Sequence, residues 1–214
     1  MLFASTTAMH ADKSHQALTT LIQQEADRYG AITFARFMEL ALYAPGLGYY
    51  EQAGQTIGRQ GDFFTSVSVG PLFGELLACQ FAGWLENLAV PRPVLVEGGA
   101  HDGRLAFDIL NELAVHHPAL SNHLEYWLIE PSPTRQAWQK VTLRTYLDRC
   151  RWFQSWTELA SFCDNSGQKL NGVVFANELL DALPVHCLRW RKTDPRCSAA
   201  PHNCRRRPRT GPWL

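Results

Sequence analysis

The pattern of apolar and polar positions predicts helices in the first part of the chain. Apolar residues recur at helical spacing from 14 to 29 and from 33 to 42, and Thr33 is a typical N-cap. Pro45 and two glycines end the second pattern, and the stretch up to residue 68 is irregular and rich in glycine. A helical pattern returns from 71 to 88. Residues 1–88 are therefore expected to form a helical region with one long loop, and loops of this length are usually functional.

From residue 94 onward, short apolar runs alternate with amphipathic segments. The expected strands are 94–97, 125–129, 152–153 and 172–176; the expected helices are 104–115 and 134–148, with a further helical turn at 159–162. This alternation is typical of an α/β domain whose parallel sheet carries helices on both faces. We expect that domain over residues 89–190.

The pattern changes again after Trp190. Arginine, proline and cysteine dominate residues 191–214, and no hydrophobic period continues. Such a segment cannot bury enough apolar surface to order itself. We therefore expect a disordered or aberrant tail, of the kind that a shift of reading frame produces.

The first group of candidate cofactor-binding residues lies at the end of the first expected strand. Glu97 ends the apolar run, Gly98, Gly99 and Gly103 lie in the turn that follows, and the next strand ends at Glu130. Such a turn lets backbone N–H groups approach a nucleoside cofactor, and an acid at the next strand end accepts bonds from ribose hydroxyls. Glu97 would repel a pyrophosphate but not a sulfonium, which favours S-adenosylmethionine over a dinucleotide. An NAD-dependent oxidoreductase is an alternative, although its turn would normally read Gly-x-Gly-x-x-Gly.

A second polar cluster, Asn177, Glu178 and Asp181, follows the strand 172–176. Glu178 and Asp181 are three positions apart, so on the first turn of a helix they share a face. They either position a substrate or are simply carboxylates that a helix N-terminus favours.

A third candidate is the segment 61–66 in the glycine-rich loop. Its aromatic pair, Phe63 and Phe64, could close over a ligand. His101, in the glycine turn, is interpreted as a residue that lines the loop rather than as a base.

Composition narrows the class of protein. The 214 residues carry no formal net charge, 46% are hydrophobic and 19% are charged, so we expect a packed core and no nucleic-acid partner. No cysteine pair or histidine cluster has zinc spacing, and no metal is expected. The six cysteines are expected to be free thiols. No signal peptide, transit peptide or membrane span is recognised, which predicts a cytoplasmic protein.

These pieces together resemble the MidA-like family of S-adenosylmethionine-dependent methyltransferases, which includes the mitochondrial arginine methyltransferase that assists assembly of respiratory complex I. The resemblance covers about residues 18–190. It is carried by several motifs in the same order: the segments 32–43, 46–50, 61–66, 73–75, 97–105 and 177–185.

The resemblance implies a Rossmann-like class I methyltransferase sheet and a role for each matching residue. Glu97, Gly98, Gly99 and Gly103 would form the cofactor loop, and Glu130, followed by Pro131, would hold the ribose. The N-terminal loop that covers the cofactor would consist of Asp62, Phe63, Phe64, Thr65 and Ser66. Asn177, Glu178 and Asp181 would face the methyl acceptor, expected to be an arginine of a protein substrate.

Two departures from the family accompany this resemblance. Where many members read Thr-Ser-Pro-Glu-Ile-Ser, this chain reads Thr-Ser-Val-Ser-Val-Gly from Thr65 to Gly70, which indicates a divergent subgroup. Family members also continue with further strands and a substrate-binding insertion, which are missing here. The alternative function is thus a truncated, inactive protein that binds a cofactor or a partner. The oligomeric state is left open.

Overall fold

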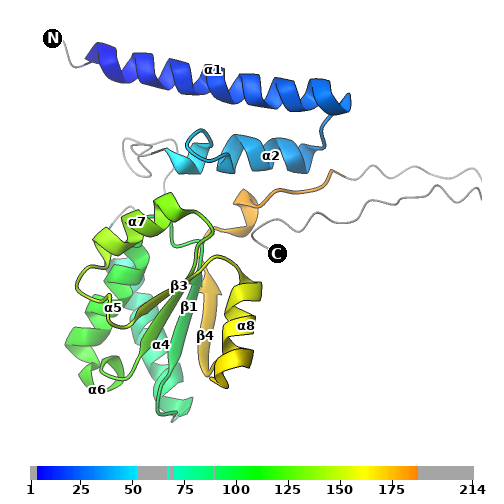
Figure 1. Cartoon of the computed structure of the whole chain (residues 1–214). Coiled ribbons are helices and arrows are strands. Elements are labelled where there is room, and N and C mark those ends of the chain that lie inside the picture. The colour runs from blue at the N-terminus through cyan, green and yellow to red at the C-terminus, as the bar shows by residue number, and fades with distance from the viewer. Residues whose placement is uncertain (1–3, 53–66, 68–69, 89, 188–214) are drawn as a thin grey trace, which may run out of the picture.

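The computed structural model describes residues 4–52, 67, 70–88 and 90–187 (Figure 1). The N-terminal elements are α1 (Ala4–Tyr29), α2 (Phe34–Tyr43) and the 3-10 helix η1 (Tyr49–Glu51). They are followed by α4 (Leu72–Leu88), β1 (Val94–Gly98), α5 (Arg104–His116), α6 (Pro118–Ser121), β2 (Glu125–Ile129) and α7 (Pro133–Thr142). The last elements are β3 (Cys150–Phe153), α8 (Trp156–Ser166), β4 (Gly172–Ala176) and the 3-10 helix η2 (Leu180–Ala182).

The four strands form one parallel sheet in the order β3-β2-β1-β4. β1 therefore lies between β2 and β4, with Glu97 opposite Leu128 on one side and Phe175 on the other. The carboxyl ends of β1, β2 and β4 meet at one edge of the sheet. This confirms the expected α/β class and brings the segments after these three strands together.

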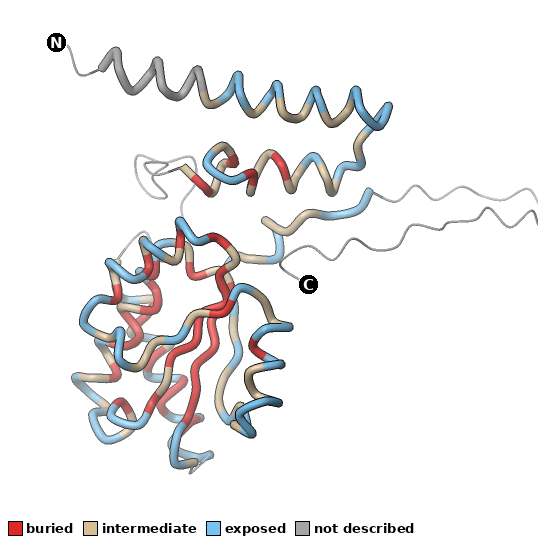
Figure 2. The backbone as a smooth tube through the Cα atoms, viewed as in Figure 1, coloured by how far each residue is buried: buried red, intermediate tan, exposed pale blue. Residues whose placement is uncertain are grey.

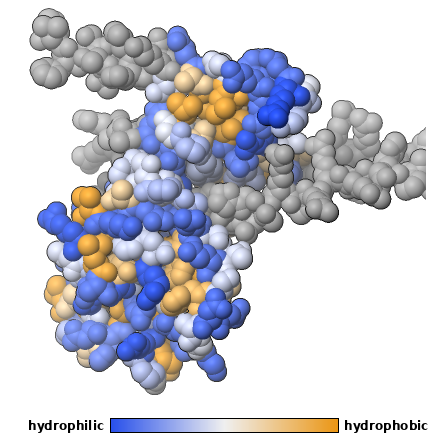
Figure 3. All heavy atoms as spheres, viewed as in Figure 1, coloured by the Kyte–Doolittle hydropathy of each residue, from blue (hydrophilic) through white to orange (hydrophobic). Residues whose placement is uncertain are grey.

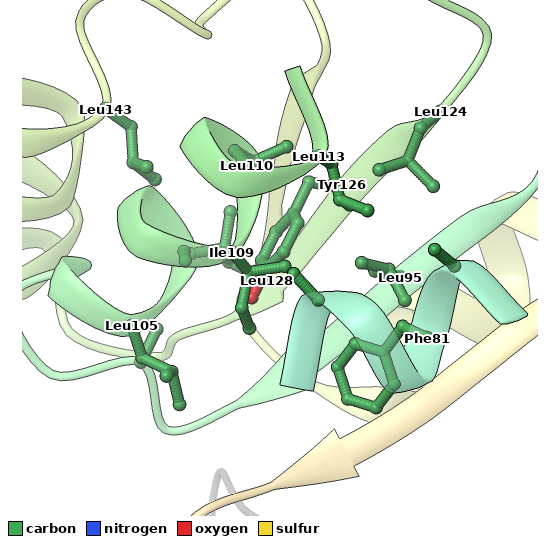
Figure 4. Close-up of a cluster of buried hydrophobic side chains, with 14 of the residues drawn as sticks. Phe81, Leu95, Leu105, Ile109, Leu110, Leu113, Leu124, Tyr126, Leu128 and Leu143 are labelled. Carbon is green, nitrogen blue, oxygen red and sulfur yellow. The ribbon is translucent and has the colours of Figure 1, made fainter. Parts of the chain in front are cut away.

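Helices cover both faces of the sheet. On one face α4 and α5 enclose the larger core, which includes Phe81, Leu95, Ile109, Tyr126 and Leu128 (Figure 4). On the other face α8 covers a smaller core built around Trp127 and Phe153. Burial is greatest along β1 and β2, whereas β4 is only partly buried (Figure 2).

The N-terminal helices lie beyond the carboxyl edge of the sheet (Figure 1). Arg36 of α2 joins α1 through two bonds to the carboxylate of Glu25, of 2.6 and 2.8 Å. On the face shown in Figure 3, hydrophobic atoms gather over this helical region, while the surface over the sheet is mixed and largely hydrophilic. From residue 14 to the end of α1 no residue is buried, and Leu40 is the buried residue of α2.

Most expected elements are confirmed, with shifted ends. Thr33 caps α2 by accepting a bond from the N–H of Arg36, at 3.2 Å. α1 begins before residue 14, and α8 extends well beyond the single turn expected at 159–162. The helix predicted to reach residue 148 ends at Thr142, because the chain must turn back through buried Leu143 to enter β3 at Cys150. The short elements η1, α6 and η2 were not predicted.

The expected tail, residues 191–214, lies outside the described residues. The domain boundaries at residues 88 and 190 remain a prediction. α4 precedes the first boundary but packs in the core of the sheet domain.

Candidate functional site

The glycine turn after β1 has a left-handed backbone at three positions. Gly99 has a φ of 74°, His101 of 48° and Gly103 of 83°. Asp102 accepts a bond from the N–H of Arg104, the first residue of α5, at 3.0 Å. Burial acts to raise the pKa of Asp102, but bonds from His101 and from the backbone lower it overall. The turn thus ends in an ionised carboxylate at the helix N-terminus.

Other segments of the chain pack so closely against the glycines of this turn that a side chain would collide with them. A Cβ on Gly99 would lie 2.7 Å from Cδ1 of Leu179, and one on Gly98 would lie 3.2 Å from the ring of Trp156. At Gly103 a Cβ would approach Cα of Gln139 to 3.2 Å. The turn is therefore pressed against the segment after β4 on one side and against α7 on the other.

Glu97 is buried and points to the same face of the sheet as Leu95. Its carboxylate accepts a bond of 2.7 Å from the hydroxyl of Tyr126, and the residue is 2% exposed. Burial raises the pKa of Glu97 to about 7, although the Tyr126 bond lowers it. A carboxylate that is partly protonated near neutral pH repels a pyrophosphate less than we expected from the sequence. Its role in cofactor choice remains a prediction.

Glu130 is completely enclosed by polar groups of α7. Its Oε1 accepts bonds from the N–H of Ser132 at 2.9 Å and from Arg135 at 2.9–3.0 Å, and its Oε2 accepts one from Gln139 at 3.1 Å. Pro131 leads directly into this helix, which Ser132 caps. The Glu130 side chain is 1% exposed. A ribose could reach it only if the covering side chains move.

The cluster after β4 departs from the expected helical turn. Glu178 lies outside η2 and has a left-handed backbone, with a φ of 48°. Glu178 and Asp181 are both exposed, and Asn177 is half-buried. The prediction that the two acids share a helical face is therefore wrong, because the chain must first turn away from β4 to start η2. Their place at the carboxyl edge is as expected.

The N-terminal segment contacts the cluster after β4 through two tyrosines. Neither was predicted from the sequence to be a site residue. The Tyr43 hydroxyl donates a bond of 2.7 Å to the carbonyl of Ala182. The rings of Tyr43 and Tyr50 stack at 5.5 Å. Burial, together with the negative charges of Asp181 and Glu178, raises the pKa of Tyr50, although Arg135 opposes this. Aromatic rings thus lie beside the acid pair.

A second contact of the N-terminal segment reaches α7. Glu51 of η1 is buried and accepts a bond of 3.0 Å from the Ser132 hydroxyl. Its carboxylate also lies 4.0 Å from Nε of Arg135, whose guanidinium stands 5.5 Å from the centre of the Tyr43 ring. Of these residues, Tyr43 lies in the motif 32–43 that carried part of the resemblance, whereas no sequence motif singled out Glu51, Ser132 or Arg135.

Several expectations concern residues that the structure does not describe. The expected cofactor-covering residues Asp62, Phe63, Phe64, Thr65 and Ser66 lie outside the described residues. In the described part of the chain, no group of three His, Cys, Asp or Glu side chains is arranged to hold a metal ion. Within the same ranges, no helix combines the length and apolar character needed to cross a membrane.

Comparison with known proteins identifies the family. Residues 76–202, more than half of the chain, match the family model described as "Putative S-adenosyl-L-methionine-dependent methyltransferase". The match passes Trp190, where we expected the resemblance to end. The structure superimposes with a TM-score of 0.63 on a COG1565 superfamily member from Burkholderia thailandensis, bound to S-adenosyl-homocysteine. That comparison has 33% identity and covers 82% of this chain and 44% of the other.

The relatives from animals are named for a more specific activity than the family model describes. The protein arginine methyltransferase NDUFAF7, mitochondrial, of Danio rerio is 31% identical over 170 residues, which cover 73% of this chain and 40% of that protein. Its human counterpart is 34% identical over 116 residues, which cover 53% of this chain and 26% of that protein. The chain thus spans less than half the length of these relatives. It belongs to the family of putative S-adenosyl-L-methionine-dependent methyltransferases that its sequence matches, and the resemblance to the MidA-like methyltransferases is confirmed.

Proposed function

We propose that this chain carries the cofactor-binding part of an S-adenosylmethionine-dependent methyltransferase that acts on arginine in a protein substrate. The observation that carries the proposal is the glycine turn at the centre of the parallel sheet, with Glu130 on one side and Glu178 on the other. The solved relative binds S-adenosyl-homocysteine, and the animal relatives are named protein arginine methyltransferases.

The residues at the edge of the sheet suit a nucleoside cofactor. The turn has a left-handed backbone at Gly99 and Gly103, which glycine adopts readily, and it follows the end of a central parallel strand, where ligands of such folds bind. Oε2 of Glu130 accepts a bond from Gln139, and a carboxylate oxygen can accept a second bond from a hydroxyl. We therefore propose that Gly98–Gly103 is the cofactor loop and that Glu130 accepts the ribose hydroxyls once its covering side chains move.

When bound, S-adenosylmethionine supplies a methyl group already activated on a sulfonium. The protein's own contribution is to position the acceptor and to provide matching charge. Glu178 and Asp181 are exposed carboxylates beside the stacked Tyr43 and Tyr50, a combination that suits a planar cation. We propose that this acid pair orients a guanidinium and that Asn177 assists.

The variant Glu178→Gln tests this assignment. It should abolish methyl transfer to an arginine-containing protein while leaving the Kd for S-adenosyl-homocysteine unchanged, because the carboxylate contacts the acceptor and not the cofactor. Transfer is measured with labelled S-adenosylmethionine, and binding by calorimetry. Asp164→Asn, which neutralises an exposed acid on α8, is the matched control and should retain transfer. Equal loss of binding and transfer in Glu178→Gln would refute the role.

A second candidate function is cofactor or partner binding without transfer. β4 pairs only with β1 among the described strands, and Val174 is 52% exposed. The chain also spans 44% of the solved relative. Binding of S-adenosyl-homocysteine by a wild-type chain that transfers no methyl group would favour this candidate.

The compartment is a separate question. The cytoplasmic location expected from the sequence remains our proposal, while the animal relatives are named mitochondrial and the solved relative is bacterial. Fractionation of cells that express the chain, with a mitochondrial marker, decides between the two compartments.

A further inference from the structure

Gln139 of α7 joins three parts of the sheet edge. Its side-chain Nε2 donates to the carbonyl of His101 at 3.0 Å and to Oε2 of Glu130 at 3.1 Å. Its Oε1 accepts a bond of 2.9 Å from the indole N–H of Trp152 in β3. The residue is completely buried. One amide therefore links the glycine turn after β1, the acid after β2, and β3.

The bond to His101 falls where the turn is strained. His101 has a φ of 48°, a conformation that residues with a Cβ rarely adopt. Such a residue persists only when its surroundings hold it, and the carbonyl of His101 is held by Gln139. Two positions later, Gly103 packs directly against Cα of Gln139. Helix α7 thus supports the backbone of the glycine turn through Gln139.

The bond to Glu130 fixes the second cofactor-binding element. Ser132 and Arg135 bond to Oε1, and Gln139 bonds to Oε2. The same Nε2 atom serves both His101 and Glu130. This one amide therefore joins the turn to the acid side chain, in addition to the backbone bond of 3.4 Å from the N–H of Gly99 to the carbonyl of Ile129.

We infer that Gln139 is a positioning residue for the nucleoside part of the cofactor: it holds the glycine turn and Glu130 at the separation that binding requires. This inference rests on the proposed function. Gln139 does not itself need to contact the cofactor. The same side chain has a purely structural partner in Trp152, and this provides a matched control.

The experiment compares two variants of the full chain by calorimetric titration with S-adenosyl-homocysteine. Gln139→Met keeps the volume but loses all three bonds, so the turn and Glu130 are no longer held in the geometry that binding requires. The Kd should rise about tenfold or more, which corresponds to about 1.4 kcal/mol of binding free energy. Trp152→Phe removes the donor to Oε1 and leaves both Nε2 bonds intact. It should lower the free energy of unfolding but change the Kd by less than about threefold.

The outcomes separate the inference from the proposed function. If wild-type protein binds and Gln139→Met binds within about threefold of it, the inference fails and the proposed function stands. An equal loss of affinity in Trp152→Phe also overturns the inference, because the effect would then follow stability. If the wild type does not bind, the proposed function and the inference fail together. Should Gln139→Met not fold, Gln139→Asn, which withdraws the amide by one methylene, serves the same comparison.

Discussion

Glu97, near the end of β1, is buried in the core and does not line the surface of the site. Glu97 is buried beside Leu95 and accepts its bond from Tyr126 on the neighbouring strand. The sequence placed this acid correctly at a strand end. Its burial was not predictable, because the partner comes from another strand and depends on the register of β1 against β2.

Glu97→Gln should therefore change how stability depends on pH. Burial raises the pKa of Glu97 from 4.5 to about 7, so the folded state holds this proton more tightly than the unfolded state. The resulting stabilisation is complete below the unfolded pKa and is lost as pH rises through about 7. Relative to the variant, the wild type should lose on the order of 3 kcal/mol between about pH 4.5 and about pH 8.

Urea unfolding of both proteins across this pH range measures the difference. The variant keeps the hydrogen bond to Tyr126 through its amide carbonyl, so groups other than the carboxyl contribute equally to both curves. A stability difference that stays constant with pH would show that Glu97 titrates normally.

At the scale of elements, one glycine allows α4 and α5 to approach closely. A Cβ on Gly74 would lie 2.6 Å from Cβ of Asp108, and Asp108 is itself buried and bonded to Arg104 of the same helix. The motif 73–75 carried part of the family resemblance, and its glycine has this physical reason.

Gly74→Ala should destabilise the protein by about 1–3 kcal/mol, because the two helices must separate to admit the methyl group. Chemical denaturation measures this. Gly83→Ala, in the same helix, is the control: a Cβ there meets nothing within 4 Å, so stability should be equal or higher. Equal effects of the two substitutions would contradict the packing argument.

Element type was largely predictable, and element ends were less so. The strands 125–129 and 172–176 coincide with β2 and β4, because short apolar runs between turn residues are distinctive. The end of α7 was missed because it is set by the distance to β3, which local periodicity does not contain. Likewise, the place of Glu178 depends on how the chain leaves β4.

At the scale of the whole molecule, the N-terminal segment is attached to the sheet domain by contacts between residues far apart in the chain. Tyr43 bonds to Ala182, and Glu51 approaches Ser132 and Arg135. These contacts hold the N-terminal segment over the carboxyl edge of the sheet. No local pattern predicts them, because they form only once the sheet has brought the strand ends together.

Arg135→Leu should lower the free energy of unfolding by about 3–5 kcal/mol, because it leaves Glu130 and Glu51 as buried, uncompensated acids. Adding Glu51→Gln should recover part of this loss, which a double-mutant cycle measures by denaturation. Strict additivity of the two substitutions would contradict a coupled docking site.

The most direct test of the account is calorimetric titration of the full chain with S-adenosyl-homocysteine and, separately, with NAD. We predict saturable one-to-one binding of S-adenosyl-homocysteine and none of NAD. Gly99→Val should lose binding, since its Cβ would collide with Leu179 at a φ of 74°, whereas Gly83→Ala should retain it. Binding of NAD in place of S-adenosyl-homocysteine, or of neither, would contradict the account.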